Sequence, residues 1–393
     1  MKNIRNSSIV GMQCIRCERD YAFDDFFEGC PACLAEGWPA SLKVRYGRFS
    51  GQLSMDTVHN WLAYPGPCLG EGHTPLVDFP GLADEAGVAG LLVKNEAANP
   101  TGSHKDRMSA LIVQRAREAG APTLAVASSG NAGTSVAAYA AHAGLGCVVV
   151  TMPGMSPNWR RACEMHGARL VATPTPDERW MLVAQKARSG EWYPVTNYMI
   201  PAVGSNPIGI DGFRAIALEL FLQTKNRSVT DIVVPTSRGD LLWGIAQGFV
   251  DLREAGLIRA IPRVHAVEPF ARIKRALEEG DYRNIYDGKS AMVSLGGSTV
   301  TFQAVDGIRK TGGSAIPVDE QDVLRDQEVL AQNGLYTELS SAAALTAARS
   351  IGLTGDAKSR TIVCIATSHG YKEFQQYREP IELYLQNGGK TEI

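Results

Sequence analysis

The feature that most constrains the fold is a repeated alternation of short apolar runs with helical stretches, which begins near residue 89. The runs are rich in aliphatic and β-branched residues, and they cover 90–94, 123–127, 147–152, 170–172, 231–235, 263–268 and 361–367. Continuous apolar runs between helices are typical of parallel strands that are buried on both faces. We therefore predict an α/β chain with a mostly parallel sheet covered by helices.

Three of these runs are followed by polar turns that contain glycine. The turns are 128–133, 236–240 and 367–370, and each comes at the end of a predicted strand. In open parallel sheets, ligands bind beyond the carboxyl ends of the strands. We therefore expect the three turns to contribute to one binding site.

A lysine lies in a further turn of this kind, immediately before a predicted helix. The segment reads Asn99-Pro100-Thr101-Gly102-Ser103-His104-Lys105-Asp106-Arg107. Backbone N–H groups at such a helix start favour an anion, and a lysine there can form a Schiff base with a carbonyl cofactor. For a turn considered alone, a solvated loop lysine is the alternative.

The bulk properties describe a globular protein with more than one small core. The chain has 393 residues, of which 45% are hydrophobic and 20% are charged, and this length favours two packed lobes plus an extension. A formal net charge of −2 provides no field that would attract nucleic acid. No apolar run approaches the roughly 18 residues that span a bilayer, and no secretory signal is visible, so we expect a cytoplasmic protein.

Four of the eight cysteines form two C-x-x-C pairs near the N-terminus. The pairs are Cys14 with Cys17 and Cys30 with Cys33, and twelve residues separate them. This spacing suits a zinc ion held tetrahedrally by four thiolates, whereas disulfides are disfavoured in a reducing cytosol. Unmetallated thiols and redox chemistry are the alternatives to a structural zinc in this segment.

Four ordered segments together resemble the tryptophan-synthase-β-like superfamily of pyridoxal-phosphate (PLP) enzymes, also called fold type II. They are the Lys105 turn, Gly70-Glu71-Gly72-His73-Thr74-Pro75-Leu76, Ser128-Ser129-Gly130-Asn131-Ala132-Gly133 and Ala366-Thr367-Ser368-His369-Gly370-Tyr371-Lys372. The likeness is strongest to threonine synthases, some of which carry a Cys-rich N-terminal segment. It implies PLP in a cleft between two domains. The expected divisions are a zinc-ribbon-like extension over 1–48, a large domain from 49–106 and 206–393, and a small domain over 107–205.

The resemblance implies a role for each turn around the cofactor. Lys105 would bind PLP and move protons at the substrate's Cα, and Asn131 would donate to the cofactor's ring oxygen. Thr367, with Ser368 as the alternative, would face the pyridine nitrogen, where a hydroxyl disfavours transamination but permits elimination. The cofactor phosphate would lie against a turn that has fewer glycines than the family's loop, formed by Ser237, Arg238, Gly239 and Asp240.

The turn after the 123–127 run suits the carboxylate of an amino-acid substrate. Its N–H groups belong to Ser128, Ser129, Gly130, Asn131 and Ala132, and an ordinary helix cap is the alternative. A threonine synthase must also bind the phosphate of its substrate. The candidates for that role are Asn158, Arg160, Arg161, Ser205 and Asn206, but the arginine that the family would place two positions after Pro207 is Gly209 here.

Three neighbouring segments have simpler interpretations. We expect Asp106 and Arg107 to form a helix-start pair, with the aspartate favoured by the helix dipole. We expect His104 to fill space where the family has an aromatic residue, and stacking near the cofactor ring is the alternative. The stretch 338–343 resembles the family's acidic, Ala/Ser-rich segment near the active site, and a helix start capped by Ser340 is the alternative.

The predicted activity is that of a PLP-dependent carbon–oxygen lyase or synthase with a small amino-acid substrate. Threonine synthase, which converts O-phosphohomoserine to threonine and phosphate, is the form that the resemblance names. One alternative is β-elimination of the serine/threonine dehydratase type or β-replacement on an O-phosphoserine-like substrate. Another is a non-catalytic zinc-knuckle interaction protein on a degenerate PLP fold. The resemblance also implies a homodimer, and neither nucleic acid nor a membrane is implied as a partner.

Overall fold

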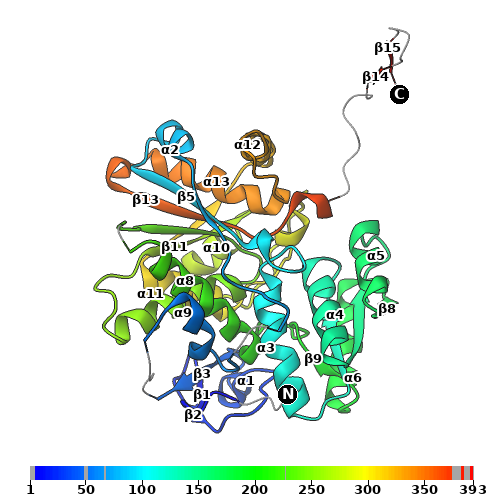
Figure 1. Ribbon diagram of the computed structural model, residues 1–393. Coiled ribbons are helices and arrows are strands. Elements are labelled where there is room, and N and C mark those ends of the chain that lie inside the picture. The colour runs from blue at the N-terminus through cyan, green and yellow to red at the C-terminus, as the bar shows by residue number, and fades with distance from the viewer. Residues whose placement is uncertain are drawn as a thin grey trace.

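The computed structural model describes residues 5–47, 52–65, 68–225, 227–373, 382–384 and 390–392. The predicted boundary between the extension and the large domain, at residues 48 and 49, lies outside this part. Figure 1 shows a small N-terminal antiparallel sheet, a larger sheet with helices on both faces, and a separate parallel sheet with its own helices.

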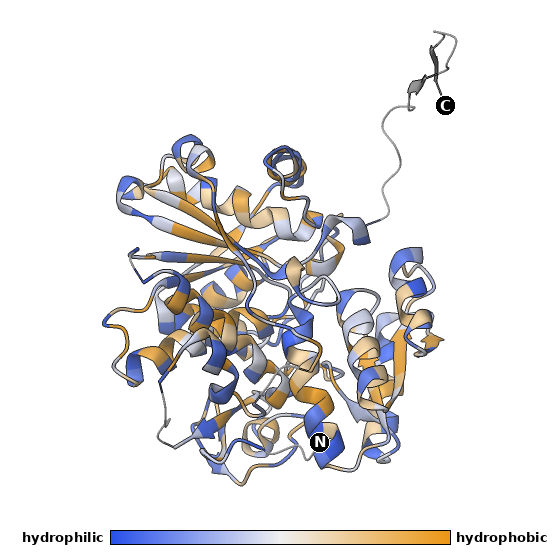
Figure 2. Ribbon diagram, in the orientation of Figure 1, coloured by the Kyte–Doolittle hydropathy of each residue, from blue (hydrophilic) through white to orange (hydrophobic). Residues whose placement is uncertain are grey.

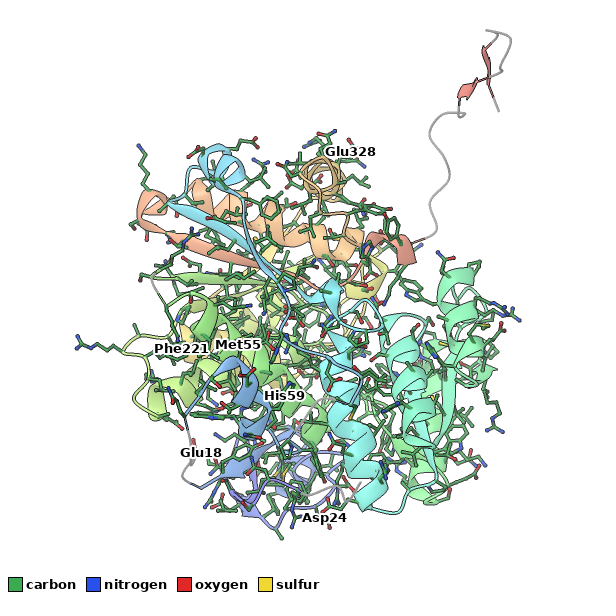
Figure 3. The ribbon with its side chains drawn as sticks, in the orientation of Figure 1. Glu18, Asp24, Met55, His59, Phe221 and Glu328 are labelled. Carbon is green, nitrogen blue, oxygen red and sulfur yellow. The ribbon has the colours of Figure 1, made fainter. Side chains whose placement is uncertain are left out.

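The N-terminal extension is built on three short strands. β1 (Ile9–Cys14) pairs antiparallel with both β2 (Asp20–Tyr21) and β3 (Leu42–Tyr46), and α1 (Pro31–Ala35) starts directly after Cys30. In Figure 3, Glu18 and Asp24 of this extension lie at the end of the molecule opposite Glu328, which belongs to α12 (Glu320–Gln332). The extension and α12 therefore lie at opposite ends of the molecule.

The larger sheet has six strands, and all its neighbouring pairs are parallel except the pair at one edge. Its order is β12 (Ala315–Pro317), β11 (Arg263–Glu268), β10 (Asp231–Pro235), β13 (Thr361–Ala366), β5 (Gly90–Asn95) and β4 (Leu76–Asp78), with β4 antiparallel to β5. Every residue of the central strand β10 is buried, because helices cover both faces of the sheet.

Alternate residues of the central strand enter two different cores. Ile232 and Val234 pack in one apolar cluster with α8 (Arg214–Gln223), α9 (Asp240–Glu254) and α11 (Phe302–Thr311). Val233 packs in a second cluster with α2 (Pro80–Ala86) and α13 (Leu339–Gly352), and α12 lies over α13. Figure 2 shows the strands of this sheet as mainly hydrophobic. Successive side chains of a strand point to opposite faces of the sheet, so β10 contributes to a separate apolar core on each face.

The smaller sheet is wholly parallel. Its order is β8 (Arg169–Ala172), β7 (Gly146–Thr151), β6 (Thr123–Ala127) and β9 (Tyr193–Pro194). α4 (Asn131–Ala143) packs on one face with α5 (Pro157–Met165) beside it, and α6 (Pro176–Arg188) packs on the other face. α3 (Lys105–Glu118) lies against α4, so the Lys105 turn stands between the two parallel sheets.

Short elements complete the fold. They are α7 (Pro207–Ile210), α10 (Ile273–Glu279), the 3-10 helices η1 (Met55–Trp61), η2 (Glu96–Ala98), η3 (Asp211–Phe213), η4 (Val293–Leu295), η5 (Ala357–Ser359) and η6 (Gly370–Lys372), and a hairpin of β14 (Glu382–Tyr384) and β15 (Lys390–Glu392). No helix in the described part of the chain is both long and apolar enough to cross a bilayer.

The α/β class and the mostly parallel pairing are confirmed, and each predicted apolar run is a strand. The sequence did not indicate β4, β9 or β12, because strands of two or three residues carry almost no periodicity. The small sheet lies wholly within the predicted small domain, and the division of the chain at 107 and 205 itself stays a prediction.

Candidate active site

A cavity of about 430 Å³ lies where strands of the two parallel sheets end. Its lining includes 128–132 after β6, 236–240 after β10, and Thr367 after β13, together with His104, Lys105 and the loop 293–299. The three turns that the sequence placed at strand ends therefore do meet. The turns after β10 and β13 lie together because the carboxyl ends of neighbouring parallel strands share one edge of the large sheet, and the turn after β6 meets them from the small sheet.

Lys105 is the first residue of α3 and its side chain enters this cavity. The chain turns into the helix at Gly102, whose φ of 76° suits glycine. Burial lowers the pKa of Lys105, an effect that Asp240 opposes and Arg238 reinforces. Its ammonium lies 5.6 Å from the centre of the Phe213 ring and makes neither an ion pair nor a hydrogen bond with any described residue. The amine is therefore available to a ligand.

The turn at 128–132 presents an uncapped helix start to the cavity. Gly130 is the N-cap of α4, and no described side chain caps this end. The Gly130 N–H donates to Ser128 Oγ at 3.2 Å, while Ser129 Oγ accepts from Thr151 Oγ1 at 2.9 Å. A Cβ added at Gly130 would meet nothing nearer than the Trp159 ring, at 3.7 Å. The alternative, an ordinary Ser or Asn cap, is therefore wrong. The Ser128 N–H donates to the Val150 carbonyl at 3.0 Å, so the N–H groups left to suit a carboxylate are those of Ser129, Asn131 and Ala132.

Asn131 joins the small-sheet side of the cavity to the large-sheet side. Its Nδ2 donates to Glu338 Oε2 at 2.8 Å, and its Oδ1 accepts from Lys372 Nζ at 2.8 Å and Ser368 Oγ at 3.2 Å. Glu338 also accepts from Ser294 Oγ at 2.6 Å. A cation on one side and a carboxylate on the other fix the orientation of the amide, which leaves its second N–H for the cavity.

Thr367 lines the cavity, whereas Ser368 lies behind it. The Thr367 hydroxyl is 2.7 Å from Ser341 Oγ at the start of α13. Its carbonyl accepts from the His104 N–H at 3.0 Å and lies 3.1 Å from Nδ1 of the same histidine. His104 is buried in the lining, and burial holds its pKa well below the ordinary value. The histidine thus lines the cavity and holds the Thr367 backbone, and its expected space-filling role stays a prediction.

The turn at 237–240 forms a cradle at the start of α9. Gly239 has a φ of 123°, and a Cβ there would lie 2.6 Å from the Ala304 backbone nitrogen, so only glycine fits. The Asp240 carboxylate accepts from Ser205 Oγ at 2.6 Å. The loop 293–299 closes the cradle, because Arg272 donates to the Gly297 carbonyl and, at 2.9 Å, to the Thr236 carbonyl.

Buried donors in the cradle await an acceptor. Arg238 Nε and Thr299 Oγ1 have no partner within the described structure, and burial lowers the pKa of Arg238. A helix start and an unpaired guanidinium favour a phosphate. The residues present therefore fit PLP: a lysine whose amine makes no ion pair or hydrogen bond with a described residue, an anion cradle and a hydroxyl at Thr367.

The four N-terminal cysteines form a cluster that can hold a metal ion. The ligand atoms of Cys14, Cys17, Cys30 and Cys33 all lie within 4.8 Å of one another. The Sγ atoms of Cys14 and Cys33 are 3.6 Å apart, and those of Cys17 and Cys30 are 3.7 Å apart. Thiolates at about 2.3 Å from a tetrahedral zinc ion have such separations.

The expectation for Asp106 and Arg107 is right for the first residue and wrong for the second. Asp106 lies in the first turn of α3, where the helix dipole favours a carboxylate, and it accepts from the Thr101 N–H and from Ser135 Oγ, both at 2.6 Å. Arg107 instead forms buried ion pairs, each at 2.6 Å, with Glu96 and Glu219.

The expected Ser340 cap is also wrong. Glu338 occupies the N-cap position of α13, and Ser340 Oγ has no hydrogen-bond partner in the described structure. The family-like interpretation of this stretch matches the geometry better, because Glu338 reaches Asn131.

The residues considered for a substrate phosphate mostly lie elsewhere. Arg160 and Arg161 are exposed, and Arg160 pairs with Glu164 at 2.9 Å. Asn158 donates to carbonyls of 371 and 372, and Asn206 caps α7. Ser205 does line the cavity, but its hydroxyl is bound to Asp240.

Several residues that line the cavity are not among the site residues predicted from the sequence. They are Trp159, Arg179, Trp180 and the loop 293–299. The only available signal was the Gly296–Gly297 pair with flanking hydroxyl residues, which resembles a phosphate loop in composition. The tryptophans and Arg179 lie on helices with no motif around them.

Comparison with known proteins agrees with this geometry. The model of the family "pyridoxal-phosphate dependent enzyme" matches residues 68–368. A threonine synthase of Methanocaldococcus jannaschii is 30% identical over 94% of this chain and 96% of its own length. Another, from Methanosarcina acetivorans, is 27% identical over 93% and 92% respectively.

Solved structures show the same fold. Maize serine racemase matches with a TM-score of 0.66 at 18% identity, covering 76% of this chain and 88% of that one. Threonine deaminase isoform 2 of Solanum lycopersicum matches with a TM-score of 0.65 at 20% identity, covering 75% and 79%. The chain therefore belongs to the fold type II family of pyridoxal-phosphate dependent enzymes, with threonine synthases among its relatives.

Proposed function

We propose that this chain is a PLP-dependent carbon–oxygen lyase or synthase of the threonine synthase type, with O-phosphohomoserine as substrate. The observation that carries the proposal is the presence of Lys105, the 128–132 turn and Thr367 around one cavity. The threonine synthase relatives, which align over nearly the whole chain, support the choice of reaction.

Proton transfer is the part of the chemistry assigned to Lys105. Bound PLP supplies an electron sink for the negative charge that develops at the substrate's Cα. Because burial lowers the pKa of Lys105, more of the amine is unprotonated near neutral pH than in a solvated lysine. The amine can then take a proton from Cα and return it later in the reaction.

The other residues hold the reacting groups. The N–H groups at the start of α4 would bind the substrate's carboxylate, and the second N–H of Asn131 would donate to the cofactor. The Ser237–Asp240 turn with Arg238 would hold the cofactor phosphate. The Thr367 hydroxyl, held by Ser341, would serve the pyridine nitrogen and leave it largely unprotonated, which would favour elimination and replacement over transamination.

One observation favours the second candidate in its serine/threonine dehydratase form, which is β-elimination from an amino acid without a phosphate. Gly209 stands where the resemblance predicts an arginine for the substrate phosphate. A Cβ at this position would lie 2.6 Å from Ile112 Cγ1 and 2.8 Å from Met108 Cγ. Helix packing therefore excludes any side chain there, and this chain must bind its substrate's leaving group with other residues.

The cysteine cluster has a structural part in the proposal. Four thiolates complete a tetrahedral zinc sphere and leave no position for substrate. The extension also contacts the predicted small domain, since Asp25 accepts from Arg115 of α3 and from Tyr193 of β9. Zinc would thus stabilise the extension against this domain without taking part in the chemistry.

Phosphate release tests the proposal. Purified holoenzyme should release phosphate from O-phosphohomoserine faster than from O-phosphoserine, with threonine as the organic product. Faster release from O-phosphoserine would favour the second candidate. Absence of release from both compounds by PLP-loaded protein would contradict the proposal and revive a non-catalytic role.

A further inference from the structure

Two side chains of α6 enter the cavity from the small-sheet side. Arg179 Nη1 lies 3.4 Å from Ser129 Oγ, and Trp180 lies beside Arg179 in the lining. Arg179 Nε and Trp180 Nε1 are buried atoms without a partner in the described structure. A guanidinium and an indole can only donate hydrogen bonds, so this wall offers donors that need an acceptor from a ligand.

No described carboxylate neutralises this guanidinium. Burial, together with the nearby charge of Arg238, lowers the pKa of Arg179 to about 10. A guanidinium with a buried Nε that has no partner favours an anion beside it. Arg238 of the 237–240 cradle lies nearby, because its guanidinium stands 5.7 Å from the centre of the Trp180 ring, and the cofactor phosphate is assigned to Arg238. Arg179 contacts the small-sheet wall through Ser129, so it is placed to bind an anion on that side of the cavity.

The substrate can supply that anion beyond its α-carboxylate. The backbone N–H groups at 128–132 already suit the α-carboxylate, and Gly209 removes the arginine expected for a distal group. Trp159 and Trp180 are both almost fully buried, with 5% and 8% of their surfaces exposed. Their rings keep water from this side of the cavity, and a charge-assisted hydrogen bond is strengthened where water is excluded.

We infer that Arg179, with Trp180 beside it, is the specificity-determining site for a distal anionic group of phosphate type on the amino-acid substrate. This inference rests on the proposed function, because it assumes that an amino acid binds at 128–132. It assigns substrate selection to α6, a helix that carries no recognisable motif.

A matched pair of unreactive ligands tests the inference by calorimetry on the PLP-loaded protein. One ligand is the phosphonate analogue of O-phosphohomoserine, in which a methylene group replaces the ester oxygen. The other is norvaline, which has the same α-amino acid group but no phosphonate. Arg179→Gln should weaken binding of the phosphonate by about 10- to 100-fold, the range for a charge-assisted contact. Norvaline binding should change by less than about 3-fold.

Two further variants control the comparison. Arg161→Gln removes the same charge from the exposed surface of α5 and should leave both affinities unchanged. Arg179→Lys keeps the charge without the planar fork and should restore part of the phosphonate affinity. Each variant should retain the wild-type far-UV circular dichroism and thermal midpoint.

Three results would overturn the inference. Equal weakening of phosphonate and norvaline would place Arg179 at the α-carboxylate. A loss of PLP affinity in Arg179→Gln would place it at the cofactor phosphate. Unchanged phosphonate affinity would show that it binds no ligand. If neither ligand binds the wild-type holoenzyme, the proposed function itself fails, and this outcome is distinct from the other three.

Discussion

The two walls of the cavity are built in different ways. On the large-sheet wall, 236–240 and Thr367 follow β10 and β13 directly, so strand geometry places their backbone groups. On the small-sheet wall, 128–132 and Thr196 follow β6 and β9, whereas Trp159, Arg179 and Trp180 come from α5 and α6. Residues assigned to binding the cofactor and the α-carboxylate thus lie at strand ends, while the side chains suited to selecting the substrate come from the helices that cover the small sheet.

The seam between the walls is a single polar network. Asn131 of α4 meets Glu338, Ser368 and Lys372, which belong to segments of the large-sheet side. A movement of one wall against the other would change these bonds first. We expect these bonds to change when the small domain closes over the substrate. Both this closure and the homodimer stay predictions.

The largest effect is expected at Lys105, which lies between the walls. Lys105→Ala should reduce kcat by at least about 1,000-fold, because it removes the proton-transferring amine. The fold should be unchanged, since the ammonium has no partner among the described residues. Phosphate release and circular dichroism measure the two effects. Activity near the wild-type level would contradict the assignment.

Gly130→Val tests whether the small-sheet wall binds the substrate and not the cofactor. The added methyl groups would fill the space between the turn and Trp159, whose ring lies 3.7 Å from a Cβ at this site. Norvaline affinity should fall by about 10-fold or more, while PLP affinity should stay within about 3-fold, because its cradle is on the other wall. Gly154→Val is the control, because no atom lies within 4 Å of a Cβ there. Equal losses in norvaline affinity and PLP affinity would contradict the assignment of the two ligands to different walls.

Cys30→Ser probes a region outside both walls. Zinc content should fall from about one ion per chain to near zero, and the thermal midpoint should fall because the extension loses its cross-link. kcat should stay near the wild-type value in protein that remains folded. Cys147→Ser, at a buried cysteine outside the cluster, should leave zinc unchanged. Wild-type protein without zinc, or a variant that retains it, would contradict the assignment.

The smallest effect is a pH dependence near the seam. Glu373 accepts from the Leu339 N–H at 2.9 Å and Gln327 Nε2 at 3.1 Å. Burial, reinforced by Glu338, raises the pKa of Glu373 to about 7 from 4.5. The unfolded chain therefore releases this proton first, and stability present below the unfolded pKa is lost as pH rises through the folded pKa.

Glu373→Gln should remove that loss. Between about pH 5 and pH 8, the free energy of unfolding should fall more in the wild type than in the variant. Urea denaturation at several pH values measures the difference. The exposed Glu278→Gln should follow the wild type, and identical pH profiles in wild type and Glu373→Gln would show that Glu373 ionises normally.

The sequence predicted the residues at strand ends well, for a physical reason. Lys105, Gly130 and Thr367 each lie in a turn whose place follows from an apolar strand beside it. Arg107 and Ser340 were misinterpreted because their partners, or their lack of one, depend on packing far along the chain. Arg179 gave no signal at all: one arginine on a helix resembles any surface arginine until α6 is docked on the small sheet.

Reduction of the holoenzyme with borohydride, followed by peptide mapping, tests the central claim most directly. The reagent fixes PLP to the lysine that holds it, and mass analysis of the peptides identifies that lysine. We predict the label on Lys105 and its absence from Lys105→Ala. A label on Lys372, a half-buried lysine whose Nζ donates to Asn131, or persistence of the label in the variant, would contradict the site described for this chain.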